Sequence, residues 1–91
     1  MKIKEIRYSS KFEKEYRALP IRIKKIAERK EELFRENAFH PTLKTHKLQG
    51  GLKEFYSFSI NREYRIIFEF ADSDVVWFHS VGDHSIYQMF D

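Results

Sequence analysis

The last third of the chain has the clearest pattern of hydrophobic and polar positions. Residues 64–70 alternate as a β-strand does, and one face of that strand would be formed by Tyr64, Ile66, Phe68 and Phe70. Arg65 falls on the opposite face, together with Ile67 and Glu69. The pattern therefore predicts a strand that buries an aromatic face and directs an arginine away from it.

A second strand follows at residues 75–82, which are β-branched or aromatic almost without interruption. Such a run is typical of a strand buried on both faces in the middle of a sheet. Residues 72–74 are turn formers, so the two strands are predicted to pair as an antiparallel hairpin. Gly82 ends the second strand and releases a polar cluster of Asp83, His84 and Tyr87. We expect Arg65 to point towards this cluster.

The first half of the chain begins with a weak alternation at residues 2–8, which indicates a short edge strand. Ser10 and Glu13 then have the spacing of a capping box, in which each side chain satisfies a free backbone amide at the start of a helix. The apolar stripe of this helix is formed by Phe12, Tyr16 and Leu19. Pro20 ends the helix and suits the first turn of the next one.

The second helix is predicted over residues 21–37, with a buried side formed by Ile23, Ile26, Ala27, Leu33 and Phe34. Residues 38–51 have little periodicity and are predicted to form a loop that carries basic residues. Residues 55–60 alternate again, with Ser57 and Ser59 pointing outward and an inward face formed by Tyr56, Phe58 and Ile60. We expect residues 88–91, at the end of the chain, to form a frayed turn.

The order of these elements predicts an α+β fold of the type β-α-α-β-β-β, in which an αα-hairpin packs on a four-stranded, mostly antiparallel sheet. The length suits one domain, residues 1–91. The chain has no cysteine, which excludes disulfides and thiolate zinc sites. No apolar run has the length of a membrane span, and the start lacks the apolar stretch of a signal peptide, so we expect a cytoplasmic protein with no membrane partner.

The charge is divided unevenly along the chain. Residues 1–65 hold all 17 Lys and Arg against nine Glu, a net charge of +8, whereas residues 66–91 hold five acids and no base, a net charge of −5. Residues 37–53 contain no acid but carry two histidines and three lysines, which are His40, His46, Lys44, Lys47 and Lys53. This division favours a polyanion as partner, with nucleic acid first, although a solvated basic surface would look the same.

Four short segments, taken in order, resemble the RelE/ParE superfamily, the toxins of bacterial type II toxin–antitoxin systems. The segments are HKLQG at 46–50, YSFSI at 56–60, YRIIF at 64–68 and VGDHSIY at 81–87. The resemblance extends to the predicted αα-hairpin and thus covers nearly the whole chain. Within the superfamily, the chain looks most similar to the YafQ-like branch. The resemblance implies the RelE-like microbial ribonuclease-type fold.

Ribonucleases of this superfamily cut messenger RNA on the ribosome without a metal, so the resemblance implies a metal-independent endoribonuclease that inhibits translation. The 2′-OH attacks the adjacent phosphate and leaves a 2′,3′-cyclic phosphate and a free 5′-OH. That reaction needs a base or orienting group for the 2′-OH, a cation for the charge on the phosphate, and an acid for the leaving 5′-oxygen.

The resemblance assigns candidate roles to five residues. Arg65 aligns with a strand arginine and can supply the cation, since its planar fork suits phosphate oxygens. His84 is the candidate general acid. His46 can orient the nucleophile or bind phosphate. Tyr87 can stack on a base or hydrogen-bond the phosphate. Asp83 can orient the ring of His84 or simply cap the strand end.

Two departures from the family pattern leave the general base unassigned. Some relatives carry a glutamate in the loop before the basic segment, and residues 41–43 here have no carboxylate. RelE itself has Lys and Arg where this chain has Asp83 and His84. His46 can serve as the base, or the reaction can depend on orientation and on Arg65. Four further cations are predicted to bind RNA, namely Lys44, Lys47, Lys53 and Arg62.

The resemblance also implies a cognate antitoxin that covers the basic cleft and the apolar residues Ile86, Met89 and Phe90, and it implies no small-molecule cofactor. Two other functions remain open, which are a ParE-like toxin that binds DNA gyrase and an inactive, RNA-binding relative. Simpler roles remain open as well. Arg65 can pair with Glu54 or Glu69, and His79 can be a satisfied sheet-face histidine. A metal site would need the side chains of His40, His46, Asp83 and His84.

Overall fold

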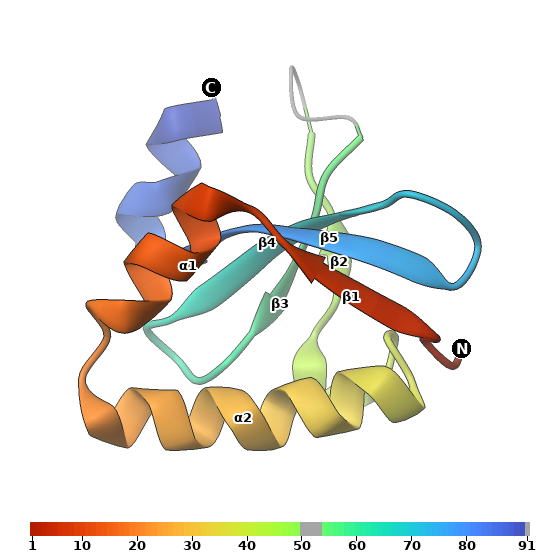
Figure 1. Cartoon of the computed structure of the whole chain (residues 1–91), viewed down its shortest axis with the longest axis horizontal. Helices are drawn as coiled ribbons and strands as arrows, with labels where there is room; N and C mark the ends of the chain where they lie inside the picture. The colour runs from red at the N-terminus through yellow and green to blue at the C-terminus, as the bar shows by residue number, and fades with distance from the viewer. Residues whose placement is uncertain (50–53, 91) are drawn as a thin grey trace.

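The computed structural model describes residues 1–49 and 54–90, and for residues 88–90 only the backbone. Two helices pack on a five-stranded mixed sheet with the strand order β1-β5-β4-β3-β2 (Figure 1). The elements in chain order are β1 Glu5–Tyr8, α1 Ser10–Arg17, α2 Ile21–Glu36, the 3-10 helix η1 Pro41–Leu43, β2 His46–Lys47, β3 Tyr56–Ser59, β4 Arg65–Phe70, β5 Val75–Gly82 and the 3-10 helix η3 His84–Phe90.

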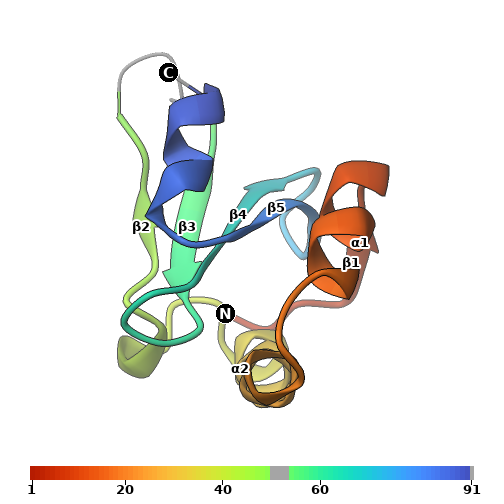
Figure 2. The ribbon, with the colours of Figure 1, turned by 90° about the vertical axis from the view of Figure 1, so that its left-hand side faces the viewer.

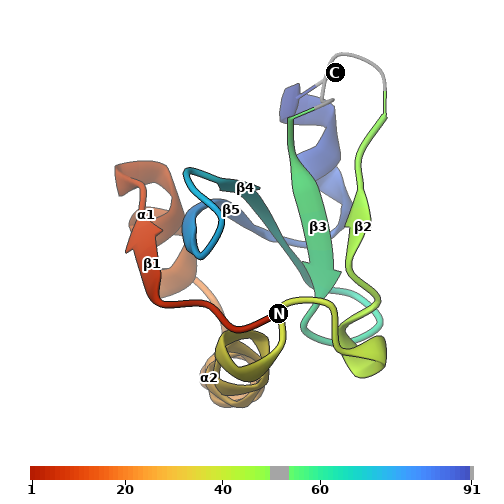
Figure 3. The ribbon, with the colours of Figure 1, turned by 90° about the vertical axis from the view of Figure 1, so that its right-hand side faces the viewer.

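The α+β class and the order of the helices and main strands are confirmed, but the predicted count of four strands is wrong. The fifth strand, β2, lies in the segment predicted to be a loop. It pairs antiparallel with β3, with His46 opposite Ser57. β1 pairs parallel with β5, so the sheet is mixed. In Figure 3, β2 and β3 lie at one edge of the sheet, and β1 lies with α1 at the other.

The helix-facing side of the sheet holds the hydrophobic core. α2 runs along this side and inserts Phe34, which is fully buried. The ring centroid of Phe34 lies 4.8 Å from that of Phe58, 4.9 Å from Phe68 and 5.4 Å from Phe78, so one helix residue contacts three strands. Burying a side chain of this size stabilises the fold by about 1.5–3 kcal/mol. The predicted inward face of residues 64–70 is thereby confirmed.

The start of α1 differs from the predicted capping box. The N-cap is Ser9, whose Oγ accepts a hydrogen bond from the N–H of Phe12 at 2.9 Å. Ser10 is already the first residue of the helix, so the predicted pairing of Ser10 with Glu13 is wrong. The residue three positions after Ser9 is Phe12, so only the serine half of the motif is present. α2 begins directly after Pro20, as predicted.

Beyond the end of β1, α1 takes over the exposed edge of β5. The Oγ of Ser9 donates to the carbonyl of His79 at 3.0 Å. A carboxylate oxygen of Glu15 accepts from the Oγ of Ser80 at 2.7 Å and from the N–H of Val81 at 3.1 Å. The last residues of β5 therefore have satisfied backbone groups without a neighbouring strand on that side.

The side of the sheet away from α2 is not simply solvated. Ser57, predicted to point outward to solvent, is fully buried, and so is Ile67 beside it. Part of the cover comes from η3, whose Tyr87 hydroxyl lies 2.7 Å from the Oγ of Ser57. Both η3 and the β2–β3 hairpin rise on the side away from α2 (Figures 1 and 2).

The end of the chain forms η3 from His84 to Phe90, where a frayed turn was predicted for the last residues. Gly82 explains how η3 reaches the sheet, because a Cβ at this position would lie 2.5 Å from Cγ2 of Ile86. Ile86 is buried in this contact, so the expectation that it is free for an antitoxin is wrong. No helix in the described part of the chain combines the length and the hydrophobicity that a membrane crossing needs.

Candidate functional site

Arg65 opens β4 on the side of the sheet away from the core, between Ser59 of β3 and Gly82 of β5. Its Nη1 donates to the carbonyl of Asn61 at 2.5 Å and to that of Tyr64 at 3.1 Å, which directs the guanidinium towards the β3–β4 turn. Neither of the carboxylates considered as partners, Glu54 and Glu69, forms an ion pair with it in the described structure.

The guanidinium of Arg65 borders a hollow of about 330 Å³, which we call the basic hollow. Its walls come from α2, η1 and the β3–β4 turn, and the lining residues are Lys30, Thr42, Lys44, Ser59, Ile60, Asn61, Arg62 and Arg65. Four of these side chains are cationic, and no carboxylate is among them. Within the described residues, none of the four cations forms an ion pair. A concave, uncompensated cluster of this kind suits an anion.

The basic hollow unites three predicted site residues with Lys30 and Thr42, which sequence reasoning missed. Arg65, Lys44 and Arg62 were predicted, whereas Lys30 lies on α2 and Thr42 on η1. Neither of the missed residues belongs to a motif, and the spacing of Lys30 along α2 carries no signal of its own. Only the packing of α2 and η1 against the turn brings them to the hollow.

Lys44 holds the one non-glycine backbone with positive φ in the described chain, at 54°. It caps η1, and its N–H bonds the carbonyl of Pro41 at 3.1 Å. Its own carbonyl lies 3.1 Å from Nδ1 of His46. Because a carbonyl can only accept, this hydrogen bond requires the proton on Nδ1 of His46. In the neutral ring, Nε2 is then left with its lone pair.

His40 has the opposite arrangement. Its Nδ1 accepts a hydrogen bond from the N–H of Thr42 at 3.1 Å and therefore carries no proton. The imidazole serves as the N-cap of η1. His40 thus has a structural contact at the start of η1.

At the other end of the site, Asp83 is engaged by Ser85. The Oγ and the N–H of Ser85 donate to the Asp83 carboxylate at 2.6 and 2.9 Å, and these two bonds lower the pKa of Asp83 below its ordinary value. The carboxylate therefore caps the start of η3. His84 is exposed, and its ring centroid lies 6.1 Å from that of Tyr87.

The strand order places Arg65 between the two histidines. β4 lies next to β5, and the segment that follows β5 carries His84. On the other side of β4, β3 separates it from β2, which carries His46. With about 4.8 Å between strands and 3.4 Å per residue along a strand, the Cα atoms of His46 and Arg65 are about 12 Å apart. His84 borders a separate hollow of about 420 Å³, lined also by Glu63, Asp83 and Ser85.

Two predicted RNA-binding lysines do not line the basic hollow as described. Lys47 pairs with Tyr56, whose ring packs against the core, whereas its neighbour His46 pairs with Ser57. Successive side chains of a strand point to opposite faces, so Lys47 and His46 lie on different sides of the sheet. Lys53 lies outside the described residues.

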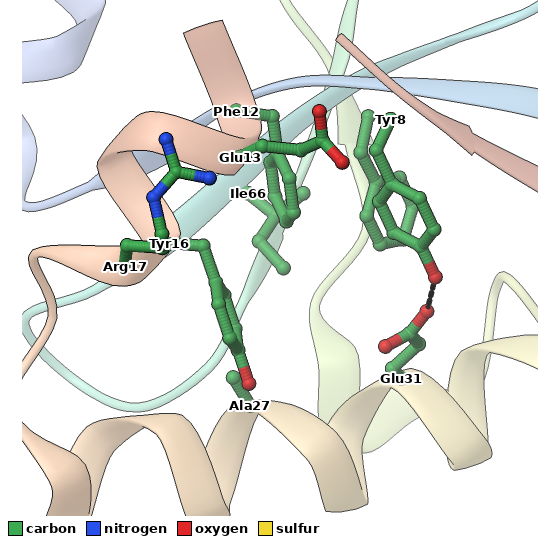
Figure 4. Close-up of a pocket in the computed structure, with 9 residues that line it drawn as sticks. Tyr8, Phe12, Glu13, Tyr16, Arg17, Ala27, Glu31 and Ile66 are labelled. Carbon is green, nitrogen blue, oxygen red and sulfur yellow. Dashed lines mark hydrogen bonds between the residues drawn. The ribbon is translucent and has the colours of Figure 1, made fainter. Parts of the chain in front are cut away.

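A second hollow, of about 320 Å³, lies between the two helices and contains none of the predicted site residues (Figure 4). We call it the interhelical hollow. Its lining residues are Tyr8, Phe12, Glu13, Tyr16, Arg17, Ala27, Glu31, Ile66 and Phe78. Tyr8 donates its hydroxyl proton to Glu31, and Arg35 also contacts that carboxylate, at 3.4 Å. This hollow mixes aromatic rings with charges of both signs.

The candidate metal ligands do not converge. No group of three or more His, Cys, Asp or Glu side chains with the geometry of a metal site occurs among the residues that the structure describes. His40 and His46 are each held by neighbouring backbone groups, and Asp83 is held by Ser85. The four residues considered for a metal site therefore do not form one there.

Comparisons of the sequence and of the fold with known proteins point to the same class of protein. Residues 3–80 match the model of a family described as the RelE-like toxin of the type II toxin–antitoxin system HigB. No protein of curated function matches the chain significantly.

Three solved structures show the same fold. YafQ from Escherichia coli BL21(DE3) is 19% identical, with 90% of this chain and 94% of that chain covered and a TM-score of 0.71. A YoeB/ParE toxin from Agrobacterium tumefaciens is 13% identical, with 89% and 99% covered and a TM-score of 0.74. The heterotetrameric YoeB–YefM toxin–antitoxin complex from Staphylococcus aureus contains a chain that is 22% identical, with 92% and 99% covered and a TM-score of 0.70.

Proposed function

Because this chain belongs to the RelE-like toxins of type II toxin–antitoxin systems, as its sequence motifs predicted, we propose that it is an endoribonuclease. In this proposal it cuts messenger RNA on the ribosome without a metal ion and so inhibits translation. The observation that carries the proposal is the basic hollow, where four cations meet without a carboxylate. Single-stranded RNA presents one negative phosphate per nucleotide, which is the charge pattern that such a hollow attracts.

Arg65 is the proposed phosphate ligand of the reaction. The guanidinium carries five N–H donors, and its two hydrogen bonds to the turn carbonyls both come from Nη1. The remaining donors can bind phosphate oxygens and stabilise the charge that develops in the transition state. The hydrogen bonds to the turn carbonyls hold the guanidinium in place before the substrate arrives, which lowers the cost of ordering it.

His46 is the proposed general base, a role that the sequence left open. The carbonyl of Lys44 fixes the proton on Nδ1 and so leaves Nε2 of the neutral ring free to accept one. Nε2 takes the proton of the 2′-OH, and the 2′-oxygen forms a bond to phosphorus. The left-handed backbone of Lys44 serves this arrangement, because it determines where the carbonyl points.

His84 is the proposed general acid. When the bond between phosphorus and the 5′-oxygen breaks, protonated His84 gives its proton to that oxygen. The products are a 2′,3′-cyclic phosphate and a 5′-OH, and the proton taken by His46 balances the one given by His84. Tyr87, held by its hydroxyl contact to Ser57, lies beside His84 and can contact the phosphate or a base. The rate should depend on pH as a bell-shaped curve, since one histidine must be neutral and the other charged.

A substrate with sulfur in place of the bridging 5′-oxygen separates the two histidines. A thiolate leaves without protonation, because a thiol is far more acidic than an alcohol. We expect the His84→Ala variant to lose activity on ordinary RNA and to regain most of it on the 5′-thio substrate. The His46→Ala variant should stay inactive on both. If both variants were inactive on the 5′-thio substrate, His84 would not be the general acid.

Expression in cells tests the function itself. We would induce the wild-type chain, His84→Ala and Arg65→Ala, follow growth and map new 5′ ends on messenger RNA. Growth arrest with new ends, absent in both variants, is the expected result. Arrest without cuts that persists in the variants would instead support a gyrase-binding toxin, and absence of arrest from a folded chain would support an inactive RNA-binding relative.

The proposed protein partner is a cognate antitoxin. The similar Staphylococcus aureus chain occurs in a toxin–antitoxin heterotetramer with YefM. An acidic segment of an antitoxin would be attracted to the basic hollow and would compete there with RNA phosphates. Addition of the antitoxin should therefore block cleavage, and the block should weaken as the salt concentration rises.

A further inference from the structure

The side of the sheet away from α2 also carries a group of rings that the proposed reaction does not use. Trp77 of β5 pairs across the sheet with Arg7 of β1 and with Glu69 of β4. The ring centroids of Trp77 and His79 lie 6.4 Å apart with their planes 24° from parallel. The ring of Phe55 meets His79 edge to face at 5.1 Å. We call Trp77, His79 and Phe55 the ring platform.

A β-bulge produces this arrangement. Ile67 pairs with Ser80 and Phe68 with Phe78, so His79 is an additional residue on β5. A bulge redirects the inserted side chain, and here it turns His79 towards Glu69, whose carboxylate lies 2.8 Å from Nε2. The rings remain accessible in part, since the His79 side chain is 26% exposed and Trp77 is half-buried.

The charged groups around the ring platform are engaged with neighbouring side chains, in contrast to those of the basic hollow. Arg7 lies over the Trp77 ring at 5.9 Å and pairs with Glu5 at 2.8 Å. The Glu69 carboxylate is hydrogen-bonded to Nε2 of His79. A platform whose charged neighbours are engaged in this way, and whose rings are partly exposed, has little attraction for phosphate. It suits a flat, uncharged group, and the unpaired bases of RNA present such faces.

We propose that the ring platform stacks an unpaired base of the RNA strand whose phosphates occupy the basic hollow. This inference rests on the proposed function and adds a base-binding subsite to it. Arg65 and Glu69 lie on the same face of β4, about 14 Å apart at 3.4 Å per residue. Ile67 and the Ser57–Tyr87 contact lie between them. An RNA strand that runs from the basic hollow to Trp77 therefore crosses η3 at Tyr87, because Ile67 and Ser57 are buried beneath it.

Trp77 is the only tryptophan of the chain, so its fluorescence reports directly on the ring platform. We would titrate the unaltered protein with a short single-stranded oligoribonucleotide whose sugars are 2′-O-methylated, because such a strand lacks the 2′-OH and cannot be cut. The control strand has the same length and phosphates but abasic sugars. A dye on each strand reports total binding by anisotropy. We expect saturable quenching of Trp77 by the strand with bases and none by the bound abasic strand.

Substitution gives a second measurement. Stacking of one base on an aromatic side chain changes affinity by about tenfold, so Trp77→Ala should weaken binding of the base-containing strand by that factor and leave the abasic strand unchanged. Trp77→Phe, which keeps a ring on the strand, should recover most of the affinity. Phe39→Ala is the matched control, because Phe39 is 45% exposed and packs on Tyr56 and Phe70 of the helix-facing side.

The possible outcomes test the ring-platform proposal and the ribonuclease proposal separately. If the protein cleaves RNA but Trp77 is not quenched, and Trp77→Ala binds with unchanged affinity, the ring-platform proposal is wrong. The ribonuclease proposal is then still supported. Quenching with base-dependent affinity but without cleavage of unmodified RNA would support the ring platform and overturn the nuclease. Equal quenching by both strands, or no binding of either, would overturn the ring platform.

Discussion

The basic hollow and the interhelical hollow are nearly equal in size, at about 330 and 320 Å³, yet they differ in how their charges are matched. The interhelical hollow mixes Glu13 and Glu31 with Arg17, and Glu31 is held by Tyr8. The basic hollow contains four cations and no acid. Volume therefore does not distinguish the two, whereas uncompensated charge does.

Uncompensated charge has an energetic cost that points to function. Two like charges 4 Å apart repel by about 1 kcal/mol even in water, and a folded protein gains nothing from gathering four of them. Sites of this kind usually mark a place where function overrides stability. A bound polyanion would offset the repulsion. The interhelical hollow needs no such explanation, since its hydrogen bond between Tyr8 and Glu31 links β1 to α2 as part of the fold.

The largest effect that tests this comparison is expected from Arg65→Ala. Loss of a positioned donor to a developing charge costs about 10²- to 10³-fold in rate, so cleavage of RNA should fall by that factor. The free energy of unfolding should fall by only about 1 kcal/mol, because the lost contacts are hydrogen bonds to turn carbonyls. Single-turnover cleavage and urea denaturation measure the two quantities.

Arg29→Ala is the control for that experiment, because Arg29 is an exposed arginine of α2 that does not line the basic hollow. It removes the same charge from the same protein, and its cleavage rate should stay close to that of the wild type. If both variants lost activity equally, net charge rather than the basic hollow would govern the reaction.

A smaller effect is expected from Lys30→Ala, compared with Lys25→Ala. Both residues lie on α2, but only Lys30 lines the basic hollow. Loss of one phosphate contact should weaken RNA binding by about two- to fivefold at low salt and reduce the slope of log K against log salt by about 0.7. Lys25→Ala should leave the slope unchanged. Binding isotherms at several salt concentrations decide, and equal slopes for the two variants would contradict a role for Lys30.

The sequence predicted the helix-facing side of the sheet well, and the physical reason is local. Alternation in residues 64–70 and the apolar stripes of the two helices each follow from burial on one face, which neighbours in sequence report. Phe34, Phe58, Phe68 and Phe78 accordingly form the core that the pattern indicates. The resemblance to a known family, carried by short motifs, then supplied the candidate roles.

The features that the sequence did not predict depend on contacts between distant segments. β2 has two residues, which is too short for any periodic pattern, and it exists because it pairs with the edge of β3. Ser57 looks like a solvent-facing strand residue, but η3 covers it through Tyr87. Lys30 reaches the basic hollow only through the packing of α2. The Lys44 carbonyl that orients His46 belongs to a residue with a left-handed backbone, and the presence of a lysine does not predict that conformation.

The smallest effect is expected at Tyr8. This residue tests the comparison in the interhelical hollow instead of in the basic hollow. Burial, and then the hydrogen bond to Glu31, raise the pKa of Tyr8 from 10.0 to about 12. A tyrosine with a raised pKa stabilises the fold at low pH, and this contribution is lost as the pH rises from 10 through about 12. Ultraviolet titration of tyrosinate should show one group near pH 12 that Tyr8→Phe removes. Glu31→Gln should lower this pKa only part of the way, because burial is the larger cause. Tyr8→Phe should cleave RNA at the wild-type rate, and a loss comparable to that of Lys30→Ala would make the interhelical hollow part of the site.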